Sequence, residues 1–517
     1  MTMSRKEFMN LSAGTLAAAV SAGFFSFLEA PAGFAEDILH SERLRKIHDH
    51  IASNKVGHIA RVQEYLRQPS VSSWGLGMRE CAELLMSYFR RLGCKEVELV
   101  KTDGHPGVWA WYDAGATKTI AYYIMYDTQP FEEKLWSSPP LAAKVVKMPP
   151  FGDVIIARGA VNDKGADAMV FNALESILEV EGKLPVNIMF TCDGEEEQGS
   201  PHFHQVLAPY LDRLKSCDAL LTLGPCQDSQ GSIEMALGFK GICALELICS
   251  GEAWGRGPQH RPIHSSRKAI LDSPTWRLIK ALDSMVAADG NRVLMEGYYD
   301  AIRPPNEEEL QLYQALVRKF AGKLLVGEKE NAKAWMNGWS DAEALRHLIF
   351  DSSLNIDGIW SGYTGPGMAT ILPDRAAAKL DCRLVPNQET AATREVIRRH
   401  LDKHGFSDIE IIPLGGGDEW SQTSVRAPAV QAVLSVYAKY GIEPAIWPRE
   451  AGSAPLAQFT RPPLNLPAVY GGLGHGNRAH SHDEYIVIEG NDKVAGIVRA
   501  EQSYVDILYA YANWPAK

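Results

Sequence analysis

Two neighbouring carboxyl groups, Glu196 and Glu197, give this sequence its clearest capacity for chemistry. They follow an apolar run at 186–192 and come just before Gly199 and Ser200. Acidic groups this close repel each other, so one of them is expected to have a raised pKa unless a cation lies nearby. Such a carboxyl group can take and give a proton as a general base or acid. A solvated charge run is the common alternative, but the position after an apolar run favours a site.

Four further polar segments follow runs that resemble strands. Asp127 and Gly224 each come at the end of an apolar run, and Asn162 and His480 lie in the other two segments. Ligands bind at the carboxyl ends of the strands in open α/β sheets, so these segments are expected to meet in one site. The segments, with that of Glu196, are 125–130, 158–165, 193–200, 223–225 and 478–485.

Helices and strands alternate through the first half of the chain. Apolar positions at helical spacing predict the helices, and runs rich in Val, Ile, Leu and aromatic residues predict the strands. This alternation indicates an α/β fold with a sheet covered by helices on both faces. The predicted helices are 42–68, 77–93, 167–181 and 201–214, and the predicted strands are 97–100, 108–112, 119–126, 186–192 and 218–223.

The pattern changes near residues 238–241 and returns to the first pattern after residue 418. Between them, strands and helices follow the order strand, helix, strand, strand, helix, strand, which predicts a small inserted α+β domain. The predicted helices lie between 266 and 350 and at 389–404, and the predicted strands are 242–250, 368–372, 376–385 and 409–413.

Length and charge exclude several classes of protein. The chain has 517 residues, 46% of them hydrophobic and 22% charged, which is typical of a globular protein with more than one domain. A net charge of −11 argues against a nucleic-acid-binding protein, which would carry a basic face.

The N-terminal segment, residues 1–35, has the pattern of an export signal. Arg5 and Lys6 precede an uncharged apolar run at 11–28, and small residues follow it. The run is short and weakly hydrophobic for a membrane span, so cleavage is expected and stable membrane insertion is not. The mature protein is therefore predicted to be periplasmic or secreted, by a signal that resembles the twin-arginine type.

The order and spacing of the five segments resemble the M20 family of metallopeptidases, and within it the carnosinase-like dipeptidases. The resemblance extends from about residue 45 to the end of the chain. It implies a zinc-peptidase-like three-layer α/β/α catalytic domain at 40–240 and 416–517. It also implies an inserted ferredoxin-like lid at 241–415 that forms a homodimer, and a small peptide-like substrate.

The family's functional residues carry over to several positions of this chain. Glu196 matches the general base and Glu197 a metal ligand, while Asp127 matches the residue that orients the ligands and His480 the late histidine ligand. In the lid, His264 resembles the histidine that stabilises the oxyanion. The positions that resemble substrate-binding groups are Arg383, Asn355, Gly452 and Ser453.

Three positions depart from the family pattern. Met125 replaces a histidine ligand, Asn162 the bridging aspartate, and Gly224 a strand-end aspartate. Zinc and hard divalent ions need anionic oxygen or imidazole donors, so the family's two-metal site is not expected in its usual form. Two alternatives remain: one divalent metal, zinc or manganese, held by Glu197, His480 and Asn162, or a site without metal.

Three functions are compatible with these residues. The first is hydrolysis of an amide bond in a dipeptide-like or N-acyl amino acid substrate, with Glu196 as base and acid. The second is a non-hydrolytic acyl-transfer or lyase reaction on the same scaffold, which the loss of metal ligands suggests. The third, a binding protein without activity, is the least favoured, because nothing in a pure binder explains why Asp127, Glu196 and His480 occur together.

Overall fold

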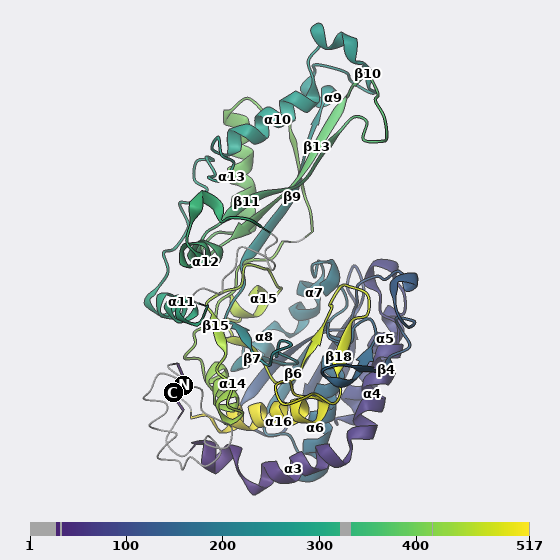
Figure 1. The fold of residues 1–517 in the computed structure, drawn as a ribbon, viewed down its shortest axis with the longest axis vertical. Helices are drawn as coiled ribbons and strands as arrows, with labels where there is room; N and C mark the ends of the chain where they lie inside the picture. The colour runs from purple at the N-terminus through teal and green to yellow at the C-terminus, as the bar shows by residue number, and fades with distance from the viewer. Residues whose placement is uncertain (1–26, 31–33, 321–331, 416, 516–517) are drawn as a thin grey trace. The chain divides into compact units, whose positions relative to one another are not determined.

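The computed structural model describes residues 27–30, 34–320, 332–415 and 417–515 (Figure 1). The predicted export signal at 1–35 therefore lies mainly outside the described residues. The chain forms two compact units. The first, called here the first domain, comprises the chain up to Leu237 with Gln422–Trp447 and Gln458–Lys517, and the second, the inserted domain, comprises Gly238–Ser421 and Pro448–Ala457.

One segment belongs to a different unit from the one that the sequence predicts. Residues 448–457, expected in the second part of the catalytic domain, belong to the inserted domain. The reason is pairing: the Lys240 N–H donates to the Glu450 carbonyl (3.1 Å), and the Arg449 guanidinium pairs with Glu309 (2.5 Å).

A six-stranded sheet forms the centre of the first domain, in the order β1-β2-β6-β3-β7-β16. The last four strands in this order are parallel, whereas β1 and β2 run antiparallel to their neighbours. The strands are β1 Glu96–Val100, β2 Gly107–Tyr112, β3 Thr119–Met125, β6 Asn187–Asp193, β7 Ala219–Leu223 and β16 Ala468–Gly471.

Aromatic contacts show that helices cover both faces of this sheet. On one face, Phe190 of β6 contacts Phe89, which in turn contacts Phe171. On the other, Tyr123 of β3 contacts Phe203 and Phe459. The three-layer α/β/α arrangement is confirmed. The covering helices include α5 Met78–Arg91 and α6 Lys164–Glu181 on the first face, and α7 Phe203–Leu207 and α15 Ala457–Thr460 on the second.

The helices differ from the predicted ranges where the backbone breaks. The predicted helix at 201–214 divides into α7, a 3-10 turn at Ala208–Tyr210 and α8 Leu211–Leu214, because Pro209 has no N–H to donate. The predicted helix at 42–68 divides at Asn54. The remaining helices of this domain are α3 Glu42–Ser53, α4 Lys55–Arg67, α14 Pro428–Lys439 and α16 Ile497–Asn513.

A second, four-stranded sheet has the order β17-β18-β5-β4 and supports two loops of the site. The loop with Asn162 follows β5, and the loop with His480 precedes β18. Buried Val154, Ile156 and Val487 hold the two strands together in an apolar cluster. The strands are β4 Lys144–Met148, β5 Gly152–Ile156, β17 Gly476–Asn477 and β18 Tyr485–Val487, and a parallel pair, β8 Glu234–Ala236 and β15 Ala445–Trp447, lies apart from both sheets.

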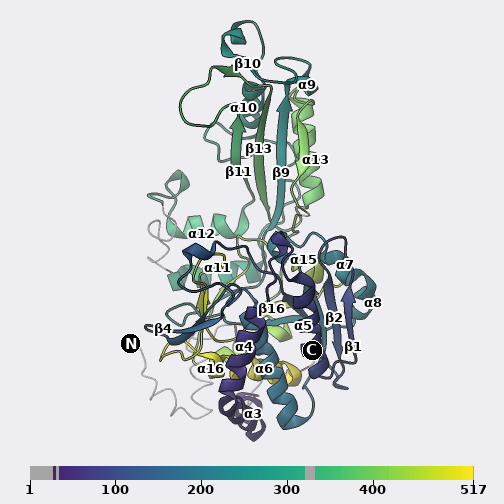
Figure 2. The ribbon, with the colours of Figure 1, turned by 90° about the vertical axis from the view of Figure 1, so that its right-hand side faces the viewer.

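The inserted domain has one antiparallel sheet in the order β11-β13-β9-β14, with two helices, α10 Pro274–Met285 and α13 Thr390–Lys403 (Figure 2). This is the predicted strand–helix–strand–strand–helix–strand plan. The predicted second strand at 368–372 is wrong, since only β12 Ile371–Leu372 forms there, paired with β10 Ile263–His264. The sheet strands are β9 Gly241–Ser250, β11 Ser353–Ser361, β13 Arg375–Leu384 and β14 Glu410–Pro413.

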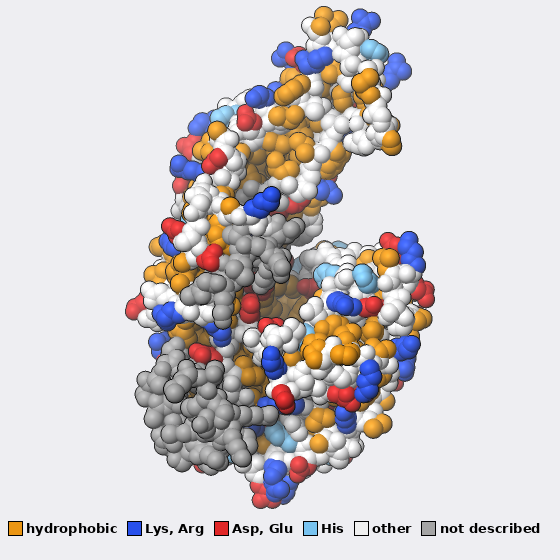
Figure 3. All heavy atoms as spheres, viewed as in Figure 1, with side chains coloured by type: hydrophobic (Ala, Val, Ile, Leu, Met, Phe, Trp, Pro, Cys, Tyr) orange, Lys and Arg blue, Asp and Glu red, His pale blue; other side chains and the backbone are white. Residues whose placement is uncertain are grey.

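Strand β11 was missed because it lies at the edge of the sheet and most of its side chains are exposed, so its sequence lacks a buried apolar alternation. Ile356, Ile359 and Trp360 are 47%, 51% and 42% exposed. Hydrophobic side chains are visible at the surface of this domain in Figure 3. Two more helices, α11 Glu307–Phe320 and α12 Asp341–Phe350, precede this strand.

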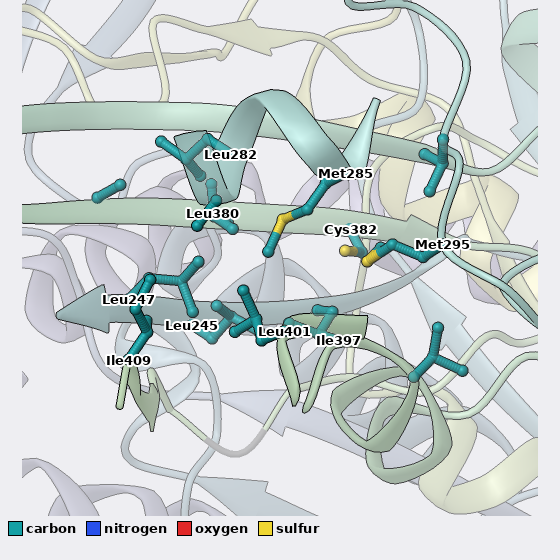
Figure 4. Close-up of a cluster of buried hydrophobic side chains, with 14 of the residues drawn as sticks. Leu245, Leu247, Leu282, Met285, Met295, Leu380, Cys382, Ile397, Leu401 and Ile409 are labelled. Carbon is teal, nitrogen blue, oxygen red and sulfur yellow. The ribbon is translucent and has the colours of Figure 1, made fainter. Parts of the chain in front are cut away.

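The core of the inserted domain lies between its sheet and its helices (Figure 4). Apolar side chains of β9 and β13 face those of α10 and α13, so each element buries one face. The core includes Leu245, Leu247, Leu282, Met285, Leu380, Cys382, Ile397 and Leu401. In the described part of the chain, no helix combines the length and the apolar character that a membrane span requires.

Candidate functional site

Asp127 fixes the turn that carries the two glutamates. It lies two residues beyond the end of β3 and is fully buried. One carboxylate oxygen accepts the Glu196 N–H and the other accepts the Glu197 N–H, both at 3.1 Å. Because β3 and β6 are parallel neighbours, this contact holds Glu196 and Glu197 at the carboxyl edge of the sheet.

Asn162, Glu197 and His480 come together as the sequence predicts. The Asn162 side-chain amide donates to Glu197 Oε1 (2.7 Å) and lies 3.0 Å from His480 Nε2. His480 Nε2 lies 3.2 Å from Glu197 Oε2, which also accepts a hydrogen bond from the Gln129 amide (2.8 Å). In this arrangement the nitrogen of the Asn162 amide faces Glu197, which accepts its hydrogen bond.

The loop that carries Asn162 is held by Glu484, a residue to which the sequence analysis gave no role. Its fully buried carboxylate accepts the backbone N–H groups of Val161 and Asn162, both at 2.9 Å, and pairs with Arg158 (2.7 Å). A buried charge needs such partners. Glu484 therefore joins the loop after β5 to the loop of His480. The only sequence signal was that Arg158 and Glu484 occur in two of the polar segments.

The carboxyl groups of the site favour their protonated forms. Burial, followed by the charge of Glu197, raises the pKa of Glu196 to about 9. Burial is also the main cause that raises the pKa of Asp127 to about 8 and that of Asp163 to about 7. The pKa of Glu197 is raised for the same reason. Acidic groups crowded without a cation are expected to behave in this way.

The donors present do not fit the two-metal centre that the resemblance implies. Met125 offers a buried thioether, and Asn162 turns its amide nitrogen toward Glu197. At Gly224, an added Cβ would lie 1.8 Å from the Tyr470 hydroxyl, so the phenol takes the space that a side chain would need. Among the residues that the structure describes, no group of three or more His, Cys, Asp or Glu is arranged to hold a metal ion.

The predicted substrate-binding residues lie in the inserted domain, and three of them are linked. Arg383 donates from Nε to Asp381 (3.0 Å) and from Nη1 to the Ser453 hydroxyl (3.2 Å). The Asn355 amide donates to the other oxygen of Asp381 (3.2 Å). Gly452 is exposed beside Ser453. The cluster presents a guanidinium group whose orientation two neighbours fix.

His264 is exposed in β10, outside this cluster. Its Nδ1 lies 2.9 Å from the Ser266 hydroxyl and its Nε2 lies 3.2 Å from the Thr370 hydroxyl. These contacts hold the imidazole across the short β10–β12 pair. The inserted domain thus contains His264, Asn355, Arg383, Gly452 and Ser453, whereas the first domain contains the acidic site.

Comparisons with known proteins identify the family to which the chain belongs. The model of peptidase family M20/M25/M40 matches residues 125–505. Human beta-Ala-His dipeptidase is 27% identical over 394 residues, 74% of each chain. The Cys-Gly metallodipeptidase DUG1 of Candida albicans is 23% identical over 468 residues, 85% of this chain and 93% of the relative.

Solved structures show the same fold. The M20 family metallo-carboxypeptidase Sso-CP2 from Sulfolobus solfataricus has a TM-score of 0.76 and 31% identity, covering 88% of this chain and 99% of that one. Human carnosine dipeptidase 1, with a TM-score of 0.66 and 21% identity, supports the fold over 91% of this chain and 99% of its own. The predicted resemblance is confirmed: the chain belongs to peptidase family M20/M25/M40 and is a hydrolase of peptide C–N bonds.

Proposed function

We propose that the enzyme hydrolyses the amide bond of a small dipeptide-like or N-acyl amino acid substrate, with Glu196 as the proton-transferring residue. The observation that carries this proposal is the pair of hydrogen bonds from the Glu196 and Glu197 N–H groups to Asp127. They hold a proton-transferring carboxyl at a sheet edge in a chain of this peptidase family. The named activities of its relatives, beta-Ala-His and Cys-Gly dipeptidases, supply the substrate class.

The proposed reaction uses Glu196 twice. As the carboxylate, it takes a proton from water while the water oxygen bonds to the carbonyl carbon. As the acid, it returns that proton to the nitrogen, the C–N bond breaks, and an acid and an amine leave. Because the pKa of Glu196 is about 9, most molecules carry the protonated acid that the second step needs at neutral pH. The first step needs the smaller fraction of molecules in which Glu196 is deprotonated.

The proposed site works without the family's two-metal centre. Glu197 and His480 are ligand types, and one zinc or manganese ion shared with Asn162 is the most that these residues could hold. The geometry favours a site without metal, because the Asn162 amide already hydrogen-bonds Glu197 and contacts His480. In this arrangement the neutral Asn162 amide lies between Glu197 and His480, where the family would have a metal ion.

The inserted domain is proposed to recognise the ends of the substrate. Arg383, held by Asp381 and Ser453, is of the residue type that can bind a carboxylate in bidentate fashion, so it is proposed to bind a carboxylate of the substrate. His264 resembles a donor to the oxyanion, a role that lowers barriers by a few kcal/mol in other enzymes. A substrate with a free or amino-acid-derived carboxylate follows from this assignment.

The test is turnover of a panel of dipeptides and N-acyl amino acids by the purified protein, with Glu196→Gln beside it. Loss of the general base is expected to lower kcat by about 10²- to 10⁴-fold. Glu195→Gln is the matched control, because the Glu195 carboxylate hydrogen-bonds His202 (2.8 Å) on the same turn. No turnover of any member of the panel, or equal activity of the Glu196 variant, would contradict the proposal.

A second candidate is acyl transfer to a nucleophile other than water. Met125, Asn162 and Gly224 stand at positions where the family has metal ligands. This favours acyl transfer, because a metal pair is what activates water in such sites. Turnover in ¹⁸O-labelled water decides between the two. Label in the acid product supports hydrolysis, whereas an unlabelled acyl product supports transfer.

The inserted domain is also proposed to form a homodimer through β11. An edge strand leaves N–H and C=O groups unpaired, and here it carries the exposed apolar residues Ile356, Ile359 and Trp360. Sedimentation is expected to show twice the mass of one chain, and Ile359→Glu is expected to halve it. A wild-type monomer at micromolar concentration would contradict the dimer.

Export remains a proposal that rests on the pattern of residues 1–35. Fractionation of producing cells is expected to place the protein outside the cytoplasm, shortened at its N-terminus. Full-length protein in the cytoplasm alone would contradict it.

A further inference from the structure

Tyr470 lies at the point where the site has lost a side chain. It belongs to β16, which runs parallel to β7 with Tyr470 opposite Thr222 and Gly471 opposite Leu223. The next residue of the neighbouring strand is Gly224. A Cβ built on Gly224 would lie 1.8 Å from the Tyr470 hydroxyl oxygen and 2.6 Å from the ring carbon that bears it. The phenol therefore lies at the carboxyl edge of the sheet, directly beside the Gly224 backbone.

The Tyr470 hydroxyl keeps its hydrogen-bonding capacity in the part of the chain that the structure describes. The residue is 38% exposed, and within the described ranges its hydroxyl has no hydrogen-bond partner. Other phenols at the same sheet edge are already engaged. The Tyr122 hydroxyl accepts the Leu223 N–H (3.0 Å), and the Tyr437 hydroxyl accepts the Gly472 N–H (3.1 Å).

The same phenol lies close to the acidic site. Burial of the phenol, followed by the negative charge of Asp163, raises the pKa of Tyr470. Asp163 directly follows Asn162, whose amide contacts Glu197 and His480. A phenol with a raised pKa keeps its proton at neutral pH, so Tyr470 can donate a hydrogen bond there.

We propose that Tyr470 is a catalytic residue that donates its hydroxyl hydrogen bond to the carbonyl oxygen of the scissile amide. This inference rests on the proposed hydrolysis and adds, from the first domain itself, a hydrogen-bond donor to the carbonyl oxygen beside the one proposed for His264. When water attacks, the carbonyl oxygen becomes negative and Tyr470 retains its proton while stabilising that charge. When the C–N bond breaks, the carbonyl re-forms and Glu196 delivers the proton to the amine. The small residue at 224 is then a requirement, because only glycine leaves room for the phenol.

The test is Tyr470→Phe, which removes only the hydroxyl. Loss of one oxyanion donor lowers kcat by about 10²- to 10³-fold in other enzymes, and the same loss is expected here with KM changed less than about threefold. Tyr299→Phe is the matched control: Tyr299 is 39% exposed, and its hydroxyl accepts the Val293 N–H (3.1 Å) in the inserted domain. An unchanged melting temperature checks that each variant is folded.

A second variant tests the same geometry from the other strand. Gly224→Ala places a methyl group where the phenol lies, so it is expected to displace the hydroxyl and to lower kcat to a similar extent. If both changes act through the hydroxyl, the double variant loses no more than Tyr470→Phe alone. Independent, multiplicative losses would contradict the shared cause.

The outcomes separate this inference from the function on which it rests. A wild-type enzyme that turns over the panel, with Tyr470→Phe within twofold of it, would overturn the role of Tyr470 and leave amide hydrolysis standing. A wild-type protein without amide turnover would overturn both. A loss confined to KM would also overturn the role, because it would place Tyr470 in binding of the ground state.

Discussion

Changing Asn162 to aspartate should reveal what the amide does. In the protein, the Asn162 nitrogen donates to Glu197 Oε1 at 2.7 Å. A carboxylate in its place would face a second carboxylate at that distance, a repulsion of about 6 kcal/mol at an effective dielectric constant of about 20. Protonation of one member limits the cost to about 1.4 kcal/mol for each pH unit above the ordinary carboxyl pKa of about 4. The expected cost is therefore about 1 kcal/mol at pH 5 and about 5 kcal/mol at pH 8.

The assay is thermal unfolding of wild type and Asn162→Asp at both pH values, with chelator and with added zinc or manganese. The variant is expected to melt near the wild type at pH 5 and well below it at pH 8 in chelator. Added metal is expected to recover much of the loss, because the new carboxylate, Glu197 and His480 then provide three ligands.

Asn162→Ala is the control for the lost hydrogen bonds. It should cost about 1 to 3 kcal/mol with little dependence on pH, since it adds no charge. A variant Asn162→Asp that is as stable as the wild type at pH 8 in chelator would show that a carboxylate at position 162 meets no repulsion from Glu197. It would mean that other groups already neutralise Glu197.

Three further predictions concern titration and the inserted domain. Because the pKa of Glu196 is about 9, kcat/KM is expected to rise with pH toward 9 as the base form accumulates, and a profile flat from pH 6 to 9 would exclude Glu196 as the base. The pKa of Asp127 is raised to about 8, so the stability it contributes is complete below its unfolded pKa of about 4 and is lost as pH rises through 8. The melting temperature is thus expected to fall from pH 6 to 9, and a rise would contradict this sign. Glu309→Ala removes a carboxylate shared by Arg303 and the buried Arg449, so it should destabilise the inserted domain by about 3 to 5 kcal/mol in denaturant unfolding, whereas a change under 1 kcal/mol would show that the ion pair is dispensable.

The sequence was sufficient for the parts of the fold in which burial is periodic. Strand β6 is buried along its whole length and follows a long apolar run, so its position and its polar end could be predicted. The proximity of Asn162, Glu197 and His480 could be predicted from the order of the polar segments, which resembles that of the family. Edge strand β11 could not be predicted, because exposed side chains on both faces leave no pattern to detect.

The finer features of the site depend on contacts between distant segments. Tyr470 follows Val469 in an ordinary apolar strand, and nothing local marks its hydroxyl as part of a site. Its importance appears only when its ring is seen to take the space beside Gly224. Likewise, the sequence shows that an asparagine at position 162 brings no charge. The direction of its amide toward Glu197 becomes known only from the packing of the two loops.

Hydrogen bonds, and not two metal ions, are proposed to hold the carboxylates of this site together. Elemental mass spectrometry of the purified protein after equilibration with zinc or manganese tests this, with turnover measured before and after chelation. We expect at most one divalent ion per chain, together with amide turnover that is lost in the Glu196→Gln variant. Close to two ions per chain, with activity that chelation abolishes, would mean instead that this chain holds two metal ions through residues other than Met125, Asn162 and Gly224.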